Sequence, residues 1–422
     1  MITAIVGINW GDEGKGRMVD LLSEKYEIIC RYQGGNNAGH TVINDKGKFI
    51  LNLLPSGILR DGTVNVMGNG MVIDIEHLCG EIDKLKEKGI KVTSDSLKIS
   101  DKAFICMPYH KTQDILEEER LGDKKYGSTR RGIAPVYGDK YMKKGIRIGD
   151  LLDSGTLKQK LVDIIEWKNI TFKGYNSEVK LDDIMGWLSE YGTKIKSYIA
   201  DTTDFLSASV KEGKDILFEA QLGALRDIDY GIYPYTTSSQ TLAAYTPIGA
   251  GIPGVKLDCV IGIMKAFSSC VGEGPFAVEM TGDEANALRE AGAEYGAATG
   301  RPRRVGAFDV PASRYGVQAQ GANELALTKL DVLSYLDKIP ICTEYEIDGI
   351  KTDRFPSGSA LEKAKPVYQY MEGFKTDVSK CRKPEDLPDA AIKYIRFIEK
   401  AVGCPIKYVS VGAGRDDYLE MR

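Results

Sequence analysis

The stretch that decides the fold is Ile2–Asp20, which reads ITAIVGINWGDEGKGRMVD. Its short, apolar and largely β-branched run Ile2–Ile8 is typical of a buried strand. Gly11–Gly16 then holds three glycines and a lysine, and Met18–Leu22 resumes an apolar pattern compatible with a helix. Glycines let backbone N–H groups approach an anion, and the amino end of a helix adds a positive dipole. We therefore expect phosphate binding at this loop, with a plain tight turn as the alternative.

The loop differs from a standard Walker sequence. The spacing from Gly11 to Lys15 is one residue short, and no Ser or Thr follows the lysine. Asp12 and Glu13 add two carboxylates, which repel phosphate unless a metal, a proton transfer or a structural ion pair uses them. The loop is therefore expected to do more than bind phosphate.

Composition bounds the remaining choices. The 422 residues are 43% hydrophobic and 27% charged, with a net charge of −4, which is ordinary for a soluble globular protein and argues against a dedicated nucleic-acid binder. The sequence shows no apolar run near the roughly 20 residues that span a membrane and no leader-like start, so we expect a cytoplasmic protein. Eight scattered cysteines without a CxxC pair and only three histidines argue against a zinc site or a disulfide framework.

Apolar runs alternate with helical stretches along most of the chain. This alternation predicts an α/β fold, a mainly parallel central sheet with helices on both faces, similar to P-loop NTPases. Further strands are expected at 27–31, 48–54, 63–67, 215–219, 257–263 and 406–411, and a helix at 75–88. From about 101 to 204 the segments become long, charged and helix-like. We interpret residues 1–422 as one domain with a helical subdomain inserted there.

Three further motifs could carry chemistry. Asn36–Thr41 follows the second strand, so His40 could face Asp12 as an acid paired with a base, or could simply bond to its own loop. Thr328–Asp331, expected after an apolar helix, resembles the Asn-Lys-x-Asp element that reads guanine, although four residues can match by chance. Thr299–Arg304 holds three arginines, which suit carboxylates and phosphates, or form a solvated basic loop.

Together these stretches resemble the adenylosuccinate synthetase family, which joins IMP to aspartate with GTP as the energy source. The matching segments run in order along the chain: Trp10–Gly16, Gly34–Thr41, Asp227–Ser239, Thr299–Arg304, Lys329–Asp331 and Ser410–Gly412. The resemblance implies a C–N bond-forming ligase that yields adenylosuccinate, GDP and phosphate through 6-phosphoryl-IMP, the first committed step from IMP to AMP.

The resemblance also implies catalytic roles. Asp12 would remove the N1 proton of IMP and bind Mg²⁺ together with the carbonyl of Gly39. His40 would be the acid that stabilises charge on the transferred phosphoryl group, and Lys15 would stabilise the same charge, as phosphoryl transfer requires.

The implied binding residues fall into three sets. GTP would contact Gly11, Asp12, Glu13, Gly14, Lys15, Gly16, Arg17, Gly39, His40, Thr41, Arg303, Lys329, Leu330, Asp331, Ser410, Val411 and Gly412. IMP would contact Asp12, Glu13, Gly14, Lys15, Asn37, Ala38, Gly39, His40, Thr129, Lys143, Gln221, Thr237 and Arg301. Aspartate would contact Ala297, Ala298, Thr299, Gly300, Arg301, Pro302 and Arg303.

The resemblance further implies a homodimer in which a residue near Lys143 reaches the partner's site. Lys143 stands where the family usually has arginine, and Gln221 lies one residue earlier than the family's glutamine. The competing interpretations are a regulatory GTPase or GTP-gated binding module, and a nucleotide kinase. The first requires a Gly-Lys-Ser/Thr sequence, which Gly14–Gly16 lacks, and the second has no use for an aspartate loop.

Overall fold

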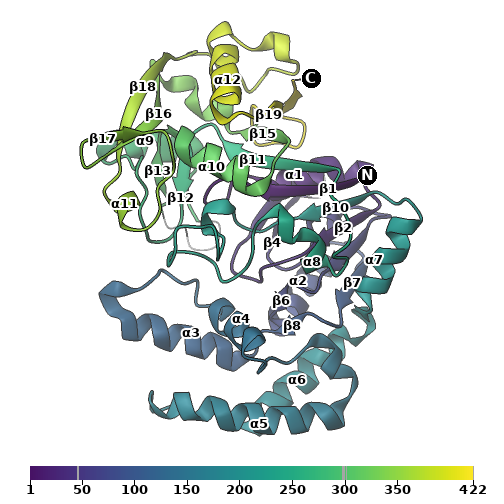
Figure 1. Cartoon of the computed structure of the whole chain (residues 1–422). Coiled ribbons are helices and arrows are strands. Elements are labelled where there is room, and N and C mark those ends of the chain that lie inside the picture. Colours follow the sequence, from purple (N-terminus) through teal and green to yellow (C-terminus); the bar gives the residue numbers. More distant parts are fainter. Residues whose placement is uncertain (45–46, 297–299, 301, 422) are drawn as a thin grey trace.

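A computed structural model describes residues 1–44, 47–296, 300 and 302–421. Within this part of the chain, ten strands form one sheet, and no helix is long and apolar enough to cross a membrane (Figure 1). All neighbours in the sheet are parallel except the last pair at one edge. In spatial order the strands are β20 (Tyr418–Glu420), β19 (Ile406–Ser410), β15 (Glu324–Thr328), β11 (Cys259–Lys265), β1 (Ile2–Gly7), β10 (Ile216–Glu219), β2 (Ile28–Arg31), β5 (Val64–Met67), β7 (Leu97–Ser100) and β9 (Ile199–Ala200).

Both faces of the central strands are buried, as the apolar run of β1 predicts. Ala4 and Val6 pack with α7 (Thr202–Lys211) and α8 (Thr246–Ala250), whereas Ile5 between them packs with α1 (Lys15–Leu22) on the other face. The same alternation recurs in β2 and β10. The predicted parallel sheet with helices on both faces is therefore confirmed.

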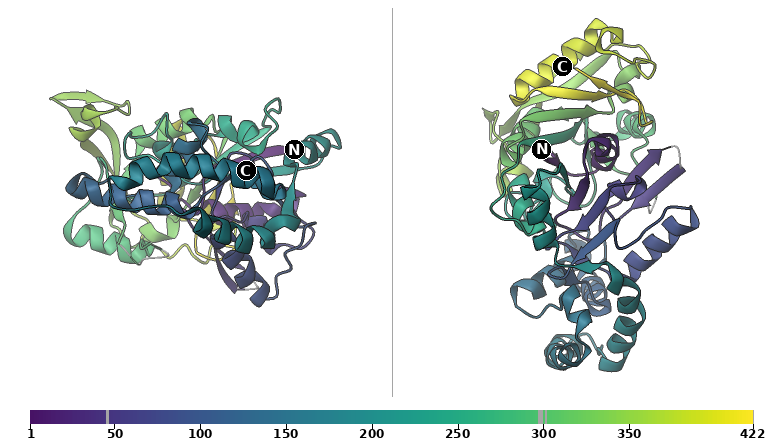
Figure 2. Two further views of the ribbon diagram at one scale, coloured as in Figure 1. Left: turned by 90° about the horizontal axis from the view of Figure 1, so that it is seen from below. Right: turned by 90° about the vertical axis from the view of Figure 1, so that its right-hand side faces the viewer.

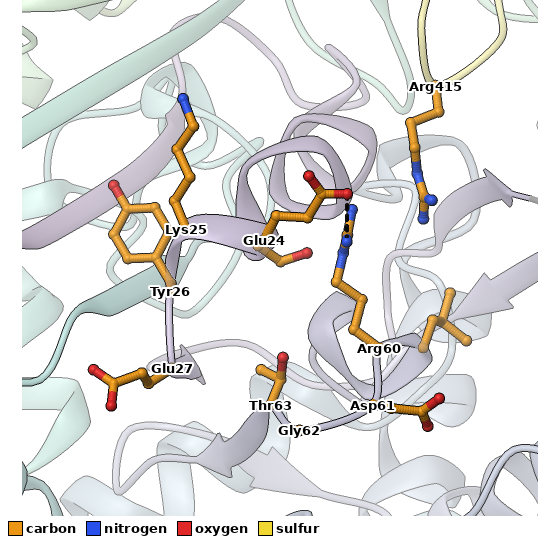
Figure 3. Close-up of a pocket in the computed structure, with 11 residues that line it drawn as sticks. Glu24, Lys25, Tyr26, Glu27, Arg60, Asp61, Gly62, Thr63 and Arg415 are labelled. Carbon is orange, nitrogen blue, oxygen red and sulfur yellow. Dashed lines mark hydrogen bonds and ion pairs between the residues drawn. The ribbon is translucent and has the colours of Figure 1, made fainter.

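The carboxyl and amino ends of the central strands border different features of the molecule. Loops from the carboxyl ends of the central strands hold the predicted motifs. The amino ends of β2 and β5 instead border a pocket of about 570 Å³ below the carboxyl end of α1 (Figure 3). Its Arg60 donates to Glu24 at 2.8 Å and to the carbonyl of Asp20 at 2.7 Å. The pocket thus lies at the opposite ends of these strands from the predicted motifs, although Arg415, which follows the predicted segment Ser410–Gly412, also lines it.

Smaller sheets carry the segments between the main strands. Residues 48–54, predicted as a strand, contribute β4 (Gly47–Leu51), which pairs with β3 (His40–Asn44) in a hairpin outside the main sheet. The other small sheets are β6 (Val72–Ile73) with β8 (Phe104–Ile105), β12 (Ser268–Cys270) with β13 (Arg304–Gly306), and β14 (Phe308–Asp309) with β16 (Lys338–Ile347), β17 (Ile350–Thr352) and β18 (Lys365–Glu372). The remaining helices on the sheet side are α2 (Ile75–Glu87), α9 (Gly282–Gly292), α10 (Val310–Gln320), α11 (Ser359–Glu362) and α12 (Asp389–Val402).

A helical layer lies at the end of the molecule opposite the C-terminal segments (Figures 1 and 2). It comprises α3 (Pro108–Leu121), α4 (Ile133–Tyr141), α5 (Ser154–Lys173) and α6 (Leu181–Ile195), which follow β8 and precede β9. The layer falls inside the segment for which the sequence predicts an inserted helical subdomain. Its status as a subdomain of a single domain stays a prediction.

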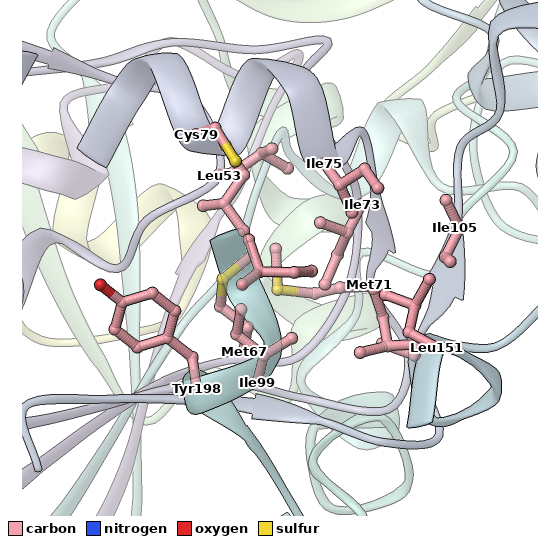
Figure 4. Close-up of a cluster of buried hydrophobic side chains, with 14 of the residues drawn as sticks. Leu53, Met67, Met71, Ile73, Ile75, Cys79, Ile99, Ile105, Leu151 and Tyr198 are labelled. Atoms are coloured by element: carbon pink, nitrogen blue, oxygen red, sulfur yellow. The ribbon is translucent and has the colours of Figure 1, made fainter. Parts of the chain in front are cut away.

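An apolar core attaches this layer to the sheet. Met67 of β5 and Ile99 of β7 pack beneath Ile75 and Cys79 of α2, with Leu151 approaching from the helical side (Figure 4). The cluster continues into Leu161 and Ile164 of α5 and Leu188 of α6. Burial of this kind contributes roughly 25 cal/mol per Å² of apolar surface, so the layer is held by packing against the sheet.

Candidate active site

The predicted motifs converge because their strands lie side by side. β19, β15, β11, β1, β10 and β2 are neighbours in the parallel part of the sheet, so their carboxyl ends meet at one edge. Ligands in open α/β sheets bind there. The site residues that follow or end these strands are Ser410, Lys329, Lys265, Asp12, Glu219 and His40. One correction belongs here: Thr328–Asp331 does not follow an apolar helix, because Thr328 is the last residue of β15.

The glycine loop bends through left-handed backbone before the helix begins. Gly11 has a φ of 102° and Asp12 a φ of 59°, and Gly14 at 100° caps α1. A side chain on Gly16 would begin 2.7 Å from the Cβ of His40, so glycine is needed for the first turn of α1 to pack on that histidine. The loop thus brings the Asp12 and His40 motifs together.

Glu13 and Lys15 form a buried pair inside the loop. Each side chain is only 3% exposed, and Nζ of Lys15 lies 2.6 Å from Oε2 of Glu13. Oε1 of Glu13 accepts from the backbone N–H groups of Asn9 at 3.2 Å and Gly11 at 2.7 Å. Glu13 therefore holds the loop and the lysine in place, which accounts for one of the two unexpected carboxylates.

Asp12 points to a different environment. Its side chain is 31% exposed, and Oδ2 lies 3.0 Å from Nη2 of Arg303. Arg303 belongs to the arginine-rich segment, so the structure brings together the predicted base and a predicted aspartate-binding residue. The carboxylate remains accessible to a ligand once Arg303 moves away.

His40 is held by a buried carboxylate that the sequence motifs missed. Nδ1 of His40 donates to Oε1 of Glu219, the last residue of β10. Glu219 also accepts from the backbone N–H and the hydroxyl of Ser56, each at 2.7 Å. Burial lowers the pKa of His40 below its usual value, although Glu219 opposes this effect. The sequence signal that could have revealed Glu219 was an acidic residue at the end of the apolar run Ile216–Phe218.

The charge on Glu219 is itself stabilised. Burial alone would raise its pKa, but His40, Arg31 and the backbone N–H of Ser56 outweigh that effect and lower it. Arg31 is completely buried beside this group. With Nδ1 committed to Glu219, only Nε2 of His40 is available to a ligand.

Gln221 faces the chain itself. Its side-chain oxygen accepts from the N–H of Gly35 at 3.1 Å, and its amide donates to the carbonyls of Gly35 at 2.9 Å and Ala38 at 3.4 Å. The side chain is fully buried. These contacts position the 34–38 loop, and contact with IMP stays a prediction for this residue.

The guanine-like motif presents an unpaired acceptor. Lys329 has a φ of 61° and begins a short 3-10 helix, Leu330–Tyr335. Oδ1 of Asp331 is buried without a hydrogen-bond partner, and burial raises the pKa of this carboxyl. A buried acceptor with no donor fits a ligand that supplies N–H groups, as guanine does through N1 and its 2-amino group.

Arg17 connects α1 to the last predicted contact segment. Its Nη1 donates to the hydroxyl of Ser410 at 3.1 Å and to the carbonyl of Gly412, and its guanidinium lies 4.4 Å from the ring centroid of Tyr418. Nη2 donates to the carbonyl of Gly414. Arg17 therefore orders the loop around Ser410–Gly412. This loop follows β19, the strand next to β15, which leads into the guanine motif.

A second buried carboxylate, Glu294, was also missed. It lies between α9 and the arginine-rich segment, and its side chain is fully buried. Lys265 at 2.8 Å, Lys329 at 2.7 Å and Arg303 at 2.8 Å all contact it. Burial would raise its pKa, but the three cations hold the pKa well below its usual range. Glu294 lies three residues before the predicted aspartate segment, but no feature of its local sequence marked it as part of the site.

The remaining predicted residues divide into three groups. Oγ1 of Thr237 and Oδ1 of Asn37 are buried without partners, as expected of groups that await a ligand. Thr129 and Lys143 lie in the helical layer, in the connection before α4 and just after it, and both are exposed. Four predicted residues lie outside the described part of the chain: Ala297, Ala298, Thr299 and Arg301.

The oxygen donors proposed for Mg²⁺ can be tested on this geometry. Among residues 1–44, 47–296, 300 and 302–421, no three His, Cys, Asp or Glu side chains form a metal-binding group. Mg²⁺ bound with nucleotide phosphates commonly uses only one or two protein carboxylates. The accessible carboxylate of Asp12, on a loop of backbone N–H groups, fits that donor set.

Comparisons with known proteins agree along the whole chain. A family model described as adenylosuccinate synthetase matches residues 4–419. The adenylosuccinate synthetase of Caldanaerobacter subterraneus subsp. tengcongensis is 45% identical over 100% of this chain and 99% of its own. That of Streptococcus gordonii is 45% identical over 98% of this chain and 96% of its own.

Solved structures give the same result. A fully ligated adenylosuccinate synthetase from Plasmodium falciparum superposes with a TM-score of 0.92 at 37% identity and covers 100% of both chains. A cyanophage S-2L succinoaminodeoxyadenylate synthetase, at 19% identity and a TM-score of 0.61 over 99% of this chain and 95% of its own, shares the fold.

Proposed function

The chain belongs to the adenylosuccinate synthetase family and is a ligase that joins IMP to L-aspartate with GTP, and we propose that the residues around Gly11–Gly16 perform the reaction. The observation that carries this assignment is the meeting of Asp12, Arg303 and the His40–Glu219 pair around one glycine loop. The comparisons give no support to a regulatory GTPase or GTP-gated module.

The first step requires a nucleophilic O6 on IMP. Once Asp12 has separated from Arg303, its carboxylate accepts the N1 proton of IMP. The electron pair of the N1–H bond then shifts charge onto O6. O6 then attacks the γ-phosphorus of GTP, the bond to the β-phosphate oxygen breaks, and GDP leaves. The partial exposure of Asp12 supports its role as the base, as does its ion pair with Arg303, a residue of the predicted aspartate segment.

His40 and Lys15 act on the charge of the transferred group. Because Nδ1 of His40 is committed to Glu219, its Nε2 is directed to the phosphoryl oxygens. Burial keeps the free histidine largely neutral, and an arriving phosphate anion raises its pKa so that it can donate. Lys15 is oriented by Glu13, which fixes the position of its charge.

The second step forms the C–N bond. The amine of aspartate attacks C6 of 6-phosphoryl-IMP, the C6–O6 bond breaks, and phosphate leaves with O6. Residues 297–303 bind the dicarboxylic substrate, and Arg303 transfers its contact from Asp12 to a substrate carboxylate. The guanidinium fork suits this exchange because it can bind two oxygens at once.

Mg²⁺ would be held by the carboxylate of Asp12 and the carbonyl of Gly39, together with phosphate oxygens. When bound it supplies positive charge that offsets the charge of the phosphates. Asp331, with its unpaired buried oxygen, receives the N–H groups of guanine, and the stem of Lys329 packs against the base. Ser410–Gly412 closes the same side, supported by Arg17.

We further propose that the protein is a homodimer. We also propose that it lies in the cytoplasm, because its substrates are metabolites found there. Lys143 would reach the partner's IMP phosphate. Its exposure just after α4, in the helical layer, supports this role.

Isotope transfer tests the two-step route. The purified protein is given IMP labelled with ¹⁸O at C6, together with GTP, aspartate and Mg²⁺, and the released phosphate is analysed by mass spectrometry. We expect one ¹⁸O per phosphate because O6 leaves attached to phosphorus. Unlabelled phosphate with full adenylosuccinate formation would overturn the 6-phosphoryl intermediate.

A further inference from the structure

A line of alternating charges connects the guanine motif to the catalytic carboxylate. It runs from Lys329 to Glu294, from Glu294 to Arg303, and from Arg303 to Asp12, with charged atoms 2.7, 2.8 and 3.0 Å apart. Within this line Glu294 contacts both cations, Lys329 and Arg303, and its side chain is fully buried. A ligand that displaces Lys329 or Arg303 from Glu294 therefore changes how strongly the carboxylate binds the other cation.

Glu294 closes the base of the predicted aspartate loop. Its carbonyl accepts from the backbone N–H of Arg303 at 2.9 Å, while its carboxylate accepts from Nη1 of the same residue at 2.8 Å. The loop is also closed by the N–H of Gly300 on the carbonyl of Gly296 at 2.8 Å, and by pairing of Tyr295 with Pro302. Glu294 therefore holds Arg303 through both its backbone carbonyl and its carboxylate.

The same residue fixes the lysine of the guanine motif. Nζ of Lys329 donates to Oε1 of Glu294 and to the carbonyl of Gly292 at the carboxyl end of α9. Lys265, at the end of β11, donates to both oxygens of Glu294 at 2.8 and 2.9 Å and to the hydroxyl of Ser269 at 2.6 Å. Lys265 thus anchors the carboxylate to the sheet, while Lys329 and Arg303 contact it from the two predicted ligand-binding segments.

We infer that Glu294 is a positioning residue that links guanine nucleotide binding at Lys329 to the placement of Arg303 for aspartate binding. This inference rests on the roles proposed above for Lys329 and Arg303. In the described chain Arg303 lies on Asp12, so aspartate binding and release of the base depend on the same arginine. A nucleotide that engages Lys329 weakens its contact with Glu294, and the carboxylate then holds Arg303 more strongly than Asp12 does.

The principal test compares Glu294→Gln with the parent enzyme. We expect KM for GTP and KM for aspartate to rise together, each by about tenfold, within the usual range of coupling between sites. Glu294→Asp, which keeps the charge on a shorter side chain, should recover part of both effects. A role in stability alone would lower the melting temperature and leave both KM values within about twofold.

A matched control is available in the helical layer. Asp139 and Lys168 form an equally buried pair at 2.8 Å. Asp139→Asn should lower the melting temperature and leave KM for GTP and aspartate unchanged. If Glu294→Gln fails to fold, Lys265→Met is added to it, because this removes the buried cation that would otherwise lose its partner.

A double-variant cycle tests the link itself. Lys329→Met should raise KM for aspartate as well as KM for GTP in the parent enzyme, and should not raise KM for aspartate further in the Glu294→Gln background. If Lys329→Met leaves KM for GTP unchanged, the proposed guanine role of Lys329 fails. If it raises KM for GTP but its effect on aspartate is the same with or without Glu294, the link through Glu294 is overturned.

Discussion

Replacing Asp12 by asparagine should separate catalysis from folding more cleanly than any other change in the loop. Among the described residues Asp12 has one ion pair, with Arg303 at 3.0 Å, and its side chain is 31% exposed. A partly exposed pair of this kind is expected to contribute about 1 kcal/mol to stability, near the upper end for surface pairs. Asparagine keeps the size of the side chain but cannot take the N1 proton of IMP. We therefore expect kcat to fall by about 10²- to 10⁴-fold, the usual contribution of a general base.

Replacing the neighbouring Glu13 should lower folding stability, which replacing Asp12 barely changes. Glu13 is 3% exposed and holds Lys15 at 2.6 Å in addition to two backbone N–H groups. Breaking a buried pair by removing one charge typically costs about 3–5 kcal/mol. Glu13→Gln should therefore lower the free energy of unfolding by about 3 kcal/mol, at the low end because glutamine can still accept from the backbone. The two adjacent carboxylates therefore differ in how much each contributes to stability.

Both variants can be assayed together. The initial rate is followed by ultraviolet absorbance as the purine gains its 6-amino substituent, and stability by urea unfolding. Asp353→Asn, which breaks an exposed pair with Arg314 at 2.7 Å, is the matched control and should change neither quantity. The reasoning is refuted if Asp12→Asn keeps its rate within about tenfold of the parent, or if it destabilises the protein as much as Glu13→Gln does.

The remaining predictions concern single residues around the site and in the helical layer. Glu219→Gln removes the carboxylate that orients His40 and should lower kcat by about 10²-fold with little change in KM for GTP. An unchanged kcat would show that catalysis by His40 does not depend on Glu219. Asp331→Asn should lower kcat/KM for GTP by about 10²-fold and improve the use of xanthosine triphosphate, whose 2-oxo group can accept from the new amide; equal loss with both nucleotides would contradict base reading. Lys143→Ala should raise KM for IMP by about tenfold through loss of a phosphate contact, and an unchanged KM removes this residue from the site. Burial lowers the pKa of His110 to about 4, below its unfolded value, so the unfolded chain binds more protons between these two values and stability falls as the pH drops through this window. Urea unfolding across the window should show a loss that His110→Gln reduces, and an identical slope in both proteins would exclude His110 as its source.

Much of this site could be predicted from local sequence. The β-branched run before Gly11 required a buried strand, and the glycines allowed only a tight loop followed by a helix. The placement of Asp12 and His40 close together then followed from the parallel sheet. The setting of Thr328–Asp331 could not be predicted as well, because the short strand Glu324–Thr328 is apolar and resembles the end of a helix when only its composition is known.

The sequence by itself determined the parallel sheet, the tight glycine loop before a helix and the family, because each is marked by short runs of residues adjacent in the chain. Only the tertiary structure decided which carboxylates are buried with which cations. Glu13 became a structural partner of Lys15, Glu219 a support for His40, and Glu294 a contact shared by three cations. Apart from the Glu13–Lys15 and Glu294–Arg303 pairs, these contacts join residues far apart in sequence, and the energy of a charge depends on its burial and its partners in space. The division between the accessible Asp12 and the buried Glu13 next to it has the same physical origin.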